Sequence, residues 1–225
     1  MSLIVFGDSF VSHERKKDFS FPFWTEQLAE KLGVSLVVHG KGGTNLNWSL
    51  LNYHNYIKND YNEEDIILFV VTSGSRLPYV HPDFNTLNAF NWQTQEDQEL
   101  LTAGRMWVKF YNEEIHQAHT YLLRQALENL PNTTMMLSGF RDSTENNRDS
   151  FSIHVGGAPL IEISLNEISL VGKERDRNRV DPRANHFHEL NHRILADDLY
   201  SMLTDKKDWY IDKTEYMTKE KIQNA

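Results

Sequence analysis

The sequence predicts a protein of the α/β class, with a parallel sheet that helices cover on both faces. Short, wholly apolar stretches recur through the first half of the chain, and such stretches are typical of buried parallel strands. Amphipathic stretches with helical spacing lie between them, which is the alternation expected of α/β folds. At 225 residues the chain is long enough for one domain with a sizeable core.

The individual elements follow from hydrophobic spacing and from residues that stop helices. Helical spacing in Pro22–Leu32 predicts a first helix, and Gly33 is expected to end it. A long helix is predicted over roughly Glu96–Leu130. The residues expected on its buried side are Leu100, Met106, Trp107, Phe110, Ile115, Tyr121, Leu122 and Leu127. The predicted strands are Leu3–Phe6, Val34–Val38, Ile66–Val71, residues 133–139 and a short one near Leu160–Leu165. The other predicted helices are Leu46–Ile57 and Glu189–Leu203, with approximate ends.

The domain organisation is expected to be simple. Residues 1–204 are predicted to form one domain, with an elaborated insert at about 78–120. Residues 205–225 are rich in charge and are expected to form a loosely attached tail.

Composition excludes several classes of function. The net charge of −9 disfavours binding to nucleic acid or to an anionic membrane, both of which need a basic face. The absence of cysteine excludes disulfides, thiolate metal sites and cysteine nucleophiles. No stretch approaches the roughly 18 apolar residues of a membrane span, and the first residues do not resemble a signal peptide. A soluble cytoplasmic protein without a cofactor is therefore expected.

Three predicted strands end in small polar residues. These endings are Gly7-Asp8-Ser9, the stretch from Gly42 to Asn45, and the stretch from Thr72 to Ser75. Ligands of open α/β sheets bind outside the carboxyl ends of the strands, so a site is expected where the three loops meet. The alternative is that these residues only form turns and helix caps.

A histidine near the end of the chain favours the first interpretation. His186 stands just before the last predicted helix. A serine hydroxyl needs a base to become a nucleophile, and histidine is the usual one. Backbone N–H groups beside glycines can hold the oxyanion that forms during acyl transfer. Ser9, Gly43 and His186 therefore make a chemically sensible set if the fold brings them together.

These residues resemble the motifs of the SGNH (GDSL-type) hydrolases. Gly7-Asp8-Ser9-Phe10 is similar to that family's first block, Gly43 in "GKGGTN" to its second, and "HFHELNHRILA" to its last. The likeness spans almost the whole chain. It implies a three-layer α/β/α sandwich with a flavodoxin-like parallel sheet of about five strands. It also implies Ser9 as nucleophile, His186 as base, and the N–H groups of Ser9 and Gly43 as oxyanion donors.

Two blocks depart from the family pattern. The third block carries "VVTSGSR", so Ser73 or Ser75 stands where the family has the asparagine that donates to the oxyanion, and Ser73 is the expected third donor. Arg183 stands where the family places the orienting aspartate, and Asp181 is the alternative acid. The Thr-Ser…Arg third block and the Asn-His final block are similar to those of phage-encoded SGNH-like proteins, which would make a virion-associated location the alternative to the cytoplasm.

The resemblance implies an esterase, with O-acetyl or short acyl groups on a carbohydrate as substrate. Asn45, Arg76, Tyr79 and Trp92 are then the expected substrate contacts. A catalytically weak binding or structural module, such as a virion component that recognises glycans, is the main alternative. An acyltransferase is a third possibility, because an alcohol can replace water as the acceptor.

His188 and His192 raise the question of a metal site. They lie four residues apart, a spacing that can hold a metal on one helix face. No neighbouring residues complete a set of ligands, so no metal is expected.

Overall fold

A four-stranded parallel sheet forms the centre of the protein, and its strands lie in the order β2-β1-β3-β4. These strands are β1 (Ser2–Gly7), β2 (Ser35–Gly40), β3 (Ile66–Val71) and β4 (Thr134–Ser138). All four were predicted from their apolar sequences. The computed structural model describes residues 1–14, 21–72, 113–140, 153–164, 187–204 and 208–218, with 98, 101–102, 105–106 and 221.

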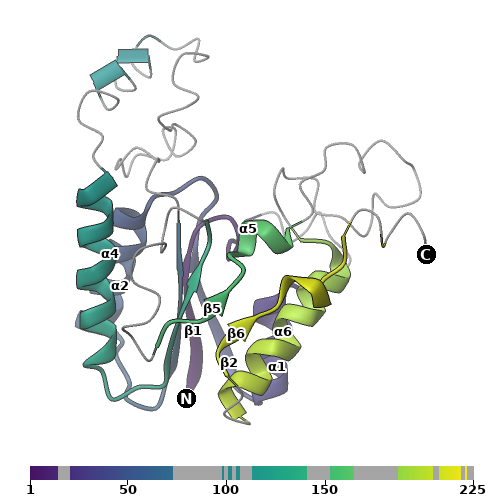
Figure 1. Ribbon diagram of the computed structural model, residues 1–225. Helices are drawn as coiled ribbons and strands as arrows, with labels where there is room; N and C mark the ends of the chain where they lie inside the picture. Colours follow the sequence, from purple (N-terminus) through teal and green to yellow (C-terminus); the bar gives the residue numbers. More distant parts are fainter. Residues whose placement is uncertain are drawn as a thin grey trace.

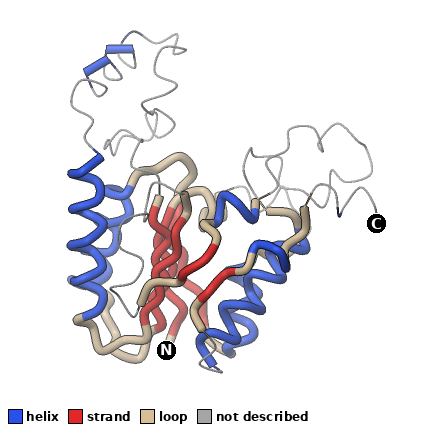
Figure 2. Tube along the Cα trace, viewed as in Figure 1, coloured by secondary structure: helices blue, strands red, loops and turns tan. Residues whose placement is uncertain are grey.

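Helices cover both faces of this sheet, as Figures 1 and 2 show. Side chains that alternate along β1 explain the layers. Leu3 and Val5 join a core with α1 (Trp24–Leu32) and α6 (Glu189–Thr204). Ile4 and Phe6 join a second core with α2 (Leu46–Asn59) and α4 (Glu113–Glu128). The predicted α/β class and its three layers are confirmed.

The helix ends have local causes. Gly33 ends α1 in a left-handed conformation, with φ 68°, which costs a glycine little because it has no Cβ. Asn45 begins α2, and its side-chain oxygen accepts a hydrogen bond from the Trp48 backbone N–H at 3.0 Å. The predicted stop at Gly33 is therefore correct.

The expected fifth strand near Leu160–Leu165 is wrong. Pro159 caps a short helix there, α5 (Leu160–Ile163), because Leu160 and Ile163 both face the core one turn apart. Residues 153–155 lie beside β4 instead. The Met136 N–H donates a hydrogen bond to the Ile153 carbonyl at 2.8 Å. The chain then enters β5 (Gly156–Gly157), which pairs in parallel with β6 (Tyr210–Ile211).

Most of the α4 residues that were expected to be buried are exposed. Leu127 is buried as expected, but Ile115, Tyr121 and Leu122 are 54%, 41% and 59% exposed. Leu123 faces the sheet instead. Of the rest of the expected long helix, residues 98, 101–102 and 105–106 are described and helical, and Met106 is 50% exposed. The other residues before Glu113, and most of the expected insert, lie outside the described part of the chain.

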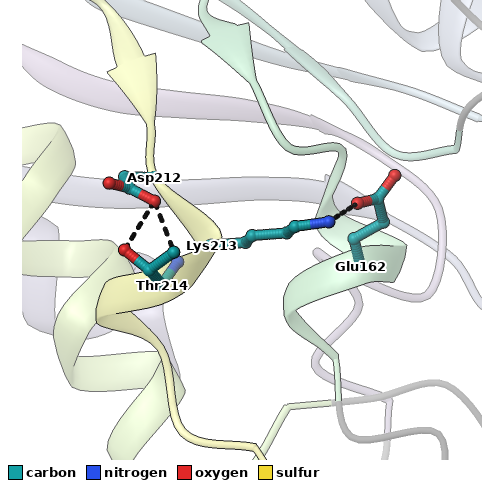
Figure 3. Close-up of polar contacts among 4 residues, drawn as sticks. All are labelled: Glu162, Asp212, Lys213 and Thr214. Atoms are coloured by element: carbon teal, nitrogen blue, oxygen red, sulfur yellow. Dashed lines mark hydrogen bonds and ion pairs between the residues drawn. The ribbon is translucent and has the colours of Figure 1, made fainter.

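The charged segment near the C-terminus is packed against the domain, so loose attachment is wrong for residues 208–218. Ile211 and Tyr216 are buried in the core shared with α6. Asn191 of α6 holds the segment: its Oδ1 accepts from the Met217 N–H at 2.7 Å, and its Nδ2 donates to the Ile163 carbonyl at 2.8 Å. The charges lie outside, where Lys213 pairs with Glu162 at 3.3 Å (Figure 3).

Figure 3 also shows why the backbone turns at this point. Asp212 Oδ1 accepts hydrogen bonds from the Thr214 N–H at 2.9 Å and from the Thr214 hydroxyl at 2.8 Å. It thereby caps the short 3-10 helix η5 (Lys213–Glu215), which leads into buried Tyr216.

None of the described helices is long and apolar enough to cross a membrane.

Replacement of Tyr216 by phenylalanine is expected to destabilise the fold. The Tyr216 hydroxyl donates to Asp198 Oδ2 at 2.7 Å in a buried setting, and phenylalanine keeps the ring while removing that bond. We expect Tyr216→Phe to lower the free energy of unfolding in urea by about 1–3 kcal/mol. Tyr210→Phe is the matched control, because Tyr210 is 59% exposed. Equal effects of the two substitutions would contradict the proposed anchoring of this segment.

The fold is also expected to lose stability at alkaline pH through Tyr56. Burial, together with the Asp65 carboxyl that its hydroxyl contacts at 3.1 Å, raises the pKa of Tyr56 from 10.0 to about 12. The folded state therefore holds this proton more tightly than the unfolded chain does. Its stabilising effect is complete below the unfolded pKa and is lost as the pH rises from 10.0 towards about 12. Urea unfolding across this range should become less pH-dependent in Tyr56→Phe.

Candidate active site

The first loop at the carboxyl edge of the sheet is a tight turn around Asp8. The Asp8 side chain is fully buried, and its Oδ1 accepts a hydrogen bond from the Phe10 N–H at 3.1 Å. The Asp8 carbonyl accepts two more, from the N–H groups of Val11 and Ser12. Ser9 stands at the tip of this turn and is partly exposed, whereas residues on either side of it are buried. The turn therefore presents Ser9 on a fixed backbone.

Two glycines allow this turn to fold back over the sheet edge. A Cβ on Gly7 would lie 2.6 Å from Val11 Cγ2, and a Cβ on Gly40 would lie 2.9 Å from the Ser12 nitrogen. Both distances are too short for a larger residue. The loop that carries Ser9 therefore lies directly against the ends of β1 and β2.

Thr72 joins three loops at this edge. Its hydroxyl donates to Asp8 Oδ2 at 2.8 Å and lies 3.4 Å from the Thr44 carbonyl oxygen. Asp8, Thr44 and Thr72 follow β1, β2 and β3 respectively, and each is at most 1% exposed. The first residue after β3 therefore meets the loops after β1 and β2, while residues 73–75 of the third loop lie outside the described part of the chain.

The second loop places Gly43 beside this network. Gly43 has φ 77°, in the left-handed region that favours glycine. Thr44 closes the turn, since its hydroxyl donates to the Lys41 carbonyl at 2.8 Å. Within the described ranges, the backbone N–H groups of Ser9 and Gly43 donate no hydrogen bond. Asn45, expected to contact substrate, is 4% exposed, and its side-chain oxygen caps α2.

The final sequence block also reaches the turn that carries Ser9. Phe187 is fully buried, and its ring centroid lies 5.4 Å from that of Phe10. Phe140, which follows β4, contacts Phe10 as well, at 5.6 Å. The described start of the last block therefore packs against the residue that directly follows Ser9.

His188 and His192 have structural uses. His188 Nδ1 accepts the Leu190 N–H at 3.1 Å, which caps the start of α6. His192 Nδ1 accepts the Trp24 N–H at 3.1 Å, and its ring stacks on Phe23 with centroids 5.1 Å apart. These hydrogen bonds use the nitrogen lone pairs that a metal would need. The described residues include no group of three or more potential metal ligands.

A second serine–histidine contact was not anticipated from the sequence. Ser138 Oγ and His154 Nε2 lie 3.1 Å apart, at the carboxyl end of β4 and on the neighbouring edge segment. The two side chains are 16 residues apart in the chain, and only the bridge between residues 136 and 154 brings them together. Both side chains are buried, at 8% and 7% exposure, whereas Ser9 is partly exposed.

The remaining predicted site residues lie outside the described part of the chain. They are Ser73, Arg76, Tyr79, Trp92, Asp181 and His186, together with Arg183. Comparison with known proteins adds no assignment: no family model, curated protein or solved structure matches this chain.

Removal of the Thr72 hydroxyl is expected to loosen the meeting point of the three loops. Thr72→Val leaves the buried Asp8 carboxylate without one of its donors, so we expect a loss of about 1–3 kcal/mol in the free energy of unfolding. Thr72→Ser keeps the hydroxyl and should cost clearly less. The measurement is urea unfolding of both variants. If valine and serine cost the same, the hydrogen bond to Asp8 does not hold the loops together.

Proposed function

We propose that this chain is a serine hydrolase of the SGNH type that cleaves esters through an acyl-enzyme. The contact between Phe10 and Phe187 carries the proposal. Ser9 and His186 are each one residue away from these rings in the chain, and consecutive Cα atoms are about 3.8 Å apart. The contact brings the segment that follows Ser9 and the segment that follows His186 to the same edge of the sheet, which supports the proposed pairing of the two.

The surroundings of Ser9 support its role as the nucleophile. It lies at the carboxyl edge of a parallel sheet, where ligands of such folds bind. The buried Asp8 and Thr72 fix the turn beneath it, so that the hydroxyl would meet a substrate with little loss of backbone freedom. Asp8 serves this structural purpose and needs no chemical role.

The proposed reaction has two steps. Ser9 Oγ attacks the ester carbonyl while His186 takes its proton, and His186 then gives that proton to the departing alcohol. The N–H groups of Ser9 and Gly43 hold the oxyanion, with the Ser73 hydroxyl as a third donor. His186 then takes a proton from water as the water oxygen attacks the acyl carbonyl. The bond from the acyl carbon to Ser9 Oγ breaks, Oγ receives that proton from His186, and the acid leaves. Asp181 is the proposed partner that orients His186.

The proposed substrate is an O-acetyl or short acyl ester on a carbohydrate. This choice rests on the resemblance of the sequence blocks to the SGNH hydrolases. Arg76, Tyr79 and Trp92 are the proposed contacts to the sugar. Asn45 is left out, because its side chain is buried and caps α2. A glycan-binding module without turnover is the alternative, and the same experiment separates the two.

The nucleophile can be tested by covalent labelling. A fluorophosphonate probe should label the wild-type protein at Ser9, as mapped by peptide mass spectrometry, and should not label Ser9→Ala. Hydrolysis of p-nitrophenyl acetate should fall at least 10³-fold in that variant, on the order expected for loss of a catalytic nucleophile.

Ser35→Ala is the matched control, because Ser35 is exposed at the opposite edge of the sheet. It should keep full labelling and full turnover. Labelling at Ser138 in place of Ser9 would assign the chemistry to the buried serine–histidine contact. Absence of both labelling and Ser9-dependent turnover would leave the binding module as the function.

A further inference from the structure

Glu14 ties the loop that carries Ser9 to the loop that carries Gly43. Its Oε2 accepts a hydrogen bond from the Gly42 N–H at 3.0 Å. Ser12 holds the same oxygen: its hydroxyl donates to Glu14 Oε2 at 3.2 Å and accepts from the Glu14 N–H at 3.2 Å. Since Ser12 is 1% exposed, the carboxylate is attached to the buried part of the first loop.

The contact fixes one side of the Gly43 turn. On the other side, the Thr44 N–H and hydroxyl both point to the Lys41 carbonyl, at 3.5 Å and 2.8 Å. The peptide that carries the Gly43 N–H therefore lies between two anchored neighbours. Gly43 itself has φ 77°, a conformation that a free glycine would leave readily, because it has many others available.

We propose that Glu14 is a positioning residue that holds the Gly43 N–H as an oxyanion donor; this inference rests on the proposed function. Glu14 does not touch the substrate. It accepts a hydrogen bond from the N–H of Gly42, the residue before Gly43. In this way it keeps the Gly43 N–H aimed at the position where negative charge develops. Preorganised donors of this kind act mainly in the transition state.

The inference predicts which kinetic constant changes. An interaction made only in the transition state affects kcat and leaves KM nearly unchanged. Removal of one oxyanion donor lowers kcat by about 10²–10³-fold. If the donor is present but poorly held, the loss in kcat should be smaller, about tenfold. Glu14→Ala is therefore expected to lower kcat for p-nitrophenyl acetate about tenfold.

Two further variants separate positioning from charge and from general destabilisation. Glu14→Gln keeps an oxygen that can accept the Gly42 N–H, so it should retain kcat within about threefold of wild type. Glu30→Ala removes an exposed acid from α1, far from the loop in sequence, and should leave kcat unchanged. Circular dichroism and the urea midpoint of each variant show whether it is folded.

A structural measurement complements the kinetics. Hydrogen exchange of the Gly42 amide, followed by nuclear magnetic resonance, should be slow in wild type and in Glu14→Gln and faster in Glu14→Ala. An unchanged kcat in Glu14→Ala would overturn the inference, as would an equal loss in the alanine and glutamine variants. If wild type shows neither labelling nor Ser9-dependent turnover, the proposed function fails first, and the catalytic role of Glu14 fails with it.

Discussion

The buried carboxyl group of Asp8 is the constraint on which the carboxyl edge of this protein depends. A polar group without exposure to water must find partners within the protein, and Asp8 finds them in the Phe10 N–H and the Thr72 hydroxyl. One partner lies in its own loop and the other follows a different strand. The turn that presents Ser9 is therefore shaped by the same group that holds the loops together.

Aromatic packing extends this edge to parts of the chain that are distant in sequence. Phe10 contacts Phe140, which follows β4, and Phe187, which precedes α6. Aromatic rings bury large apolar areas and prefer particular relative orientations, so these contacts define positions as well as contribute stability. The turn after β1, the end of β4 and the start of α6 thus meet around one side chain.

The sheet and its covering helices could be predicted from sequence because strands with two buried faces are wholly apolar, and because Gly33 marks a helix end locally. The helix at Leu160–Ile163 and the packed segment around Tyr216 could not, since their partners, Asn191 among them, lie far away in the chain. In the candidate site, loop composition was enough to single out Ser9 and Gly43 as candidates. Nothing local marks Glu14 as a partner of Gly42, because only the fold makes that contact.

The hydrogen bond from the Trp24 N–H to His192 joins residues 168 positions apart. β1, β2 and β3, with the two helices between them, are complete by Val71, so these three strands leave the ribosome early. The face that α6 covers, including buried Trp24 and Leu28, would stay open to water until the last part of the chain emerges. Such late closure lengthens the time during which a nascent chain can aggregate or bind a chaperone. The order of synthesis, and not only the final contacts, therefore sets how safely this protein folds.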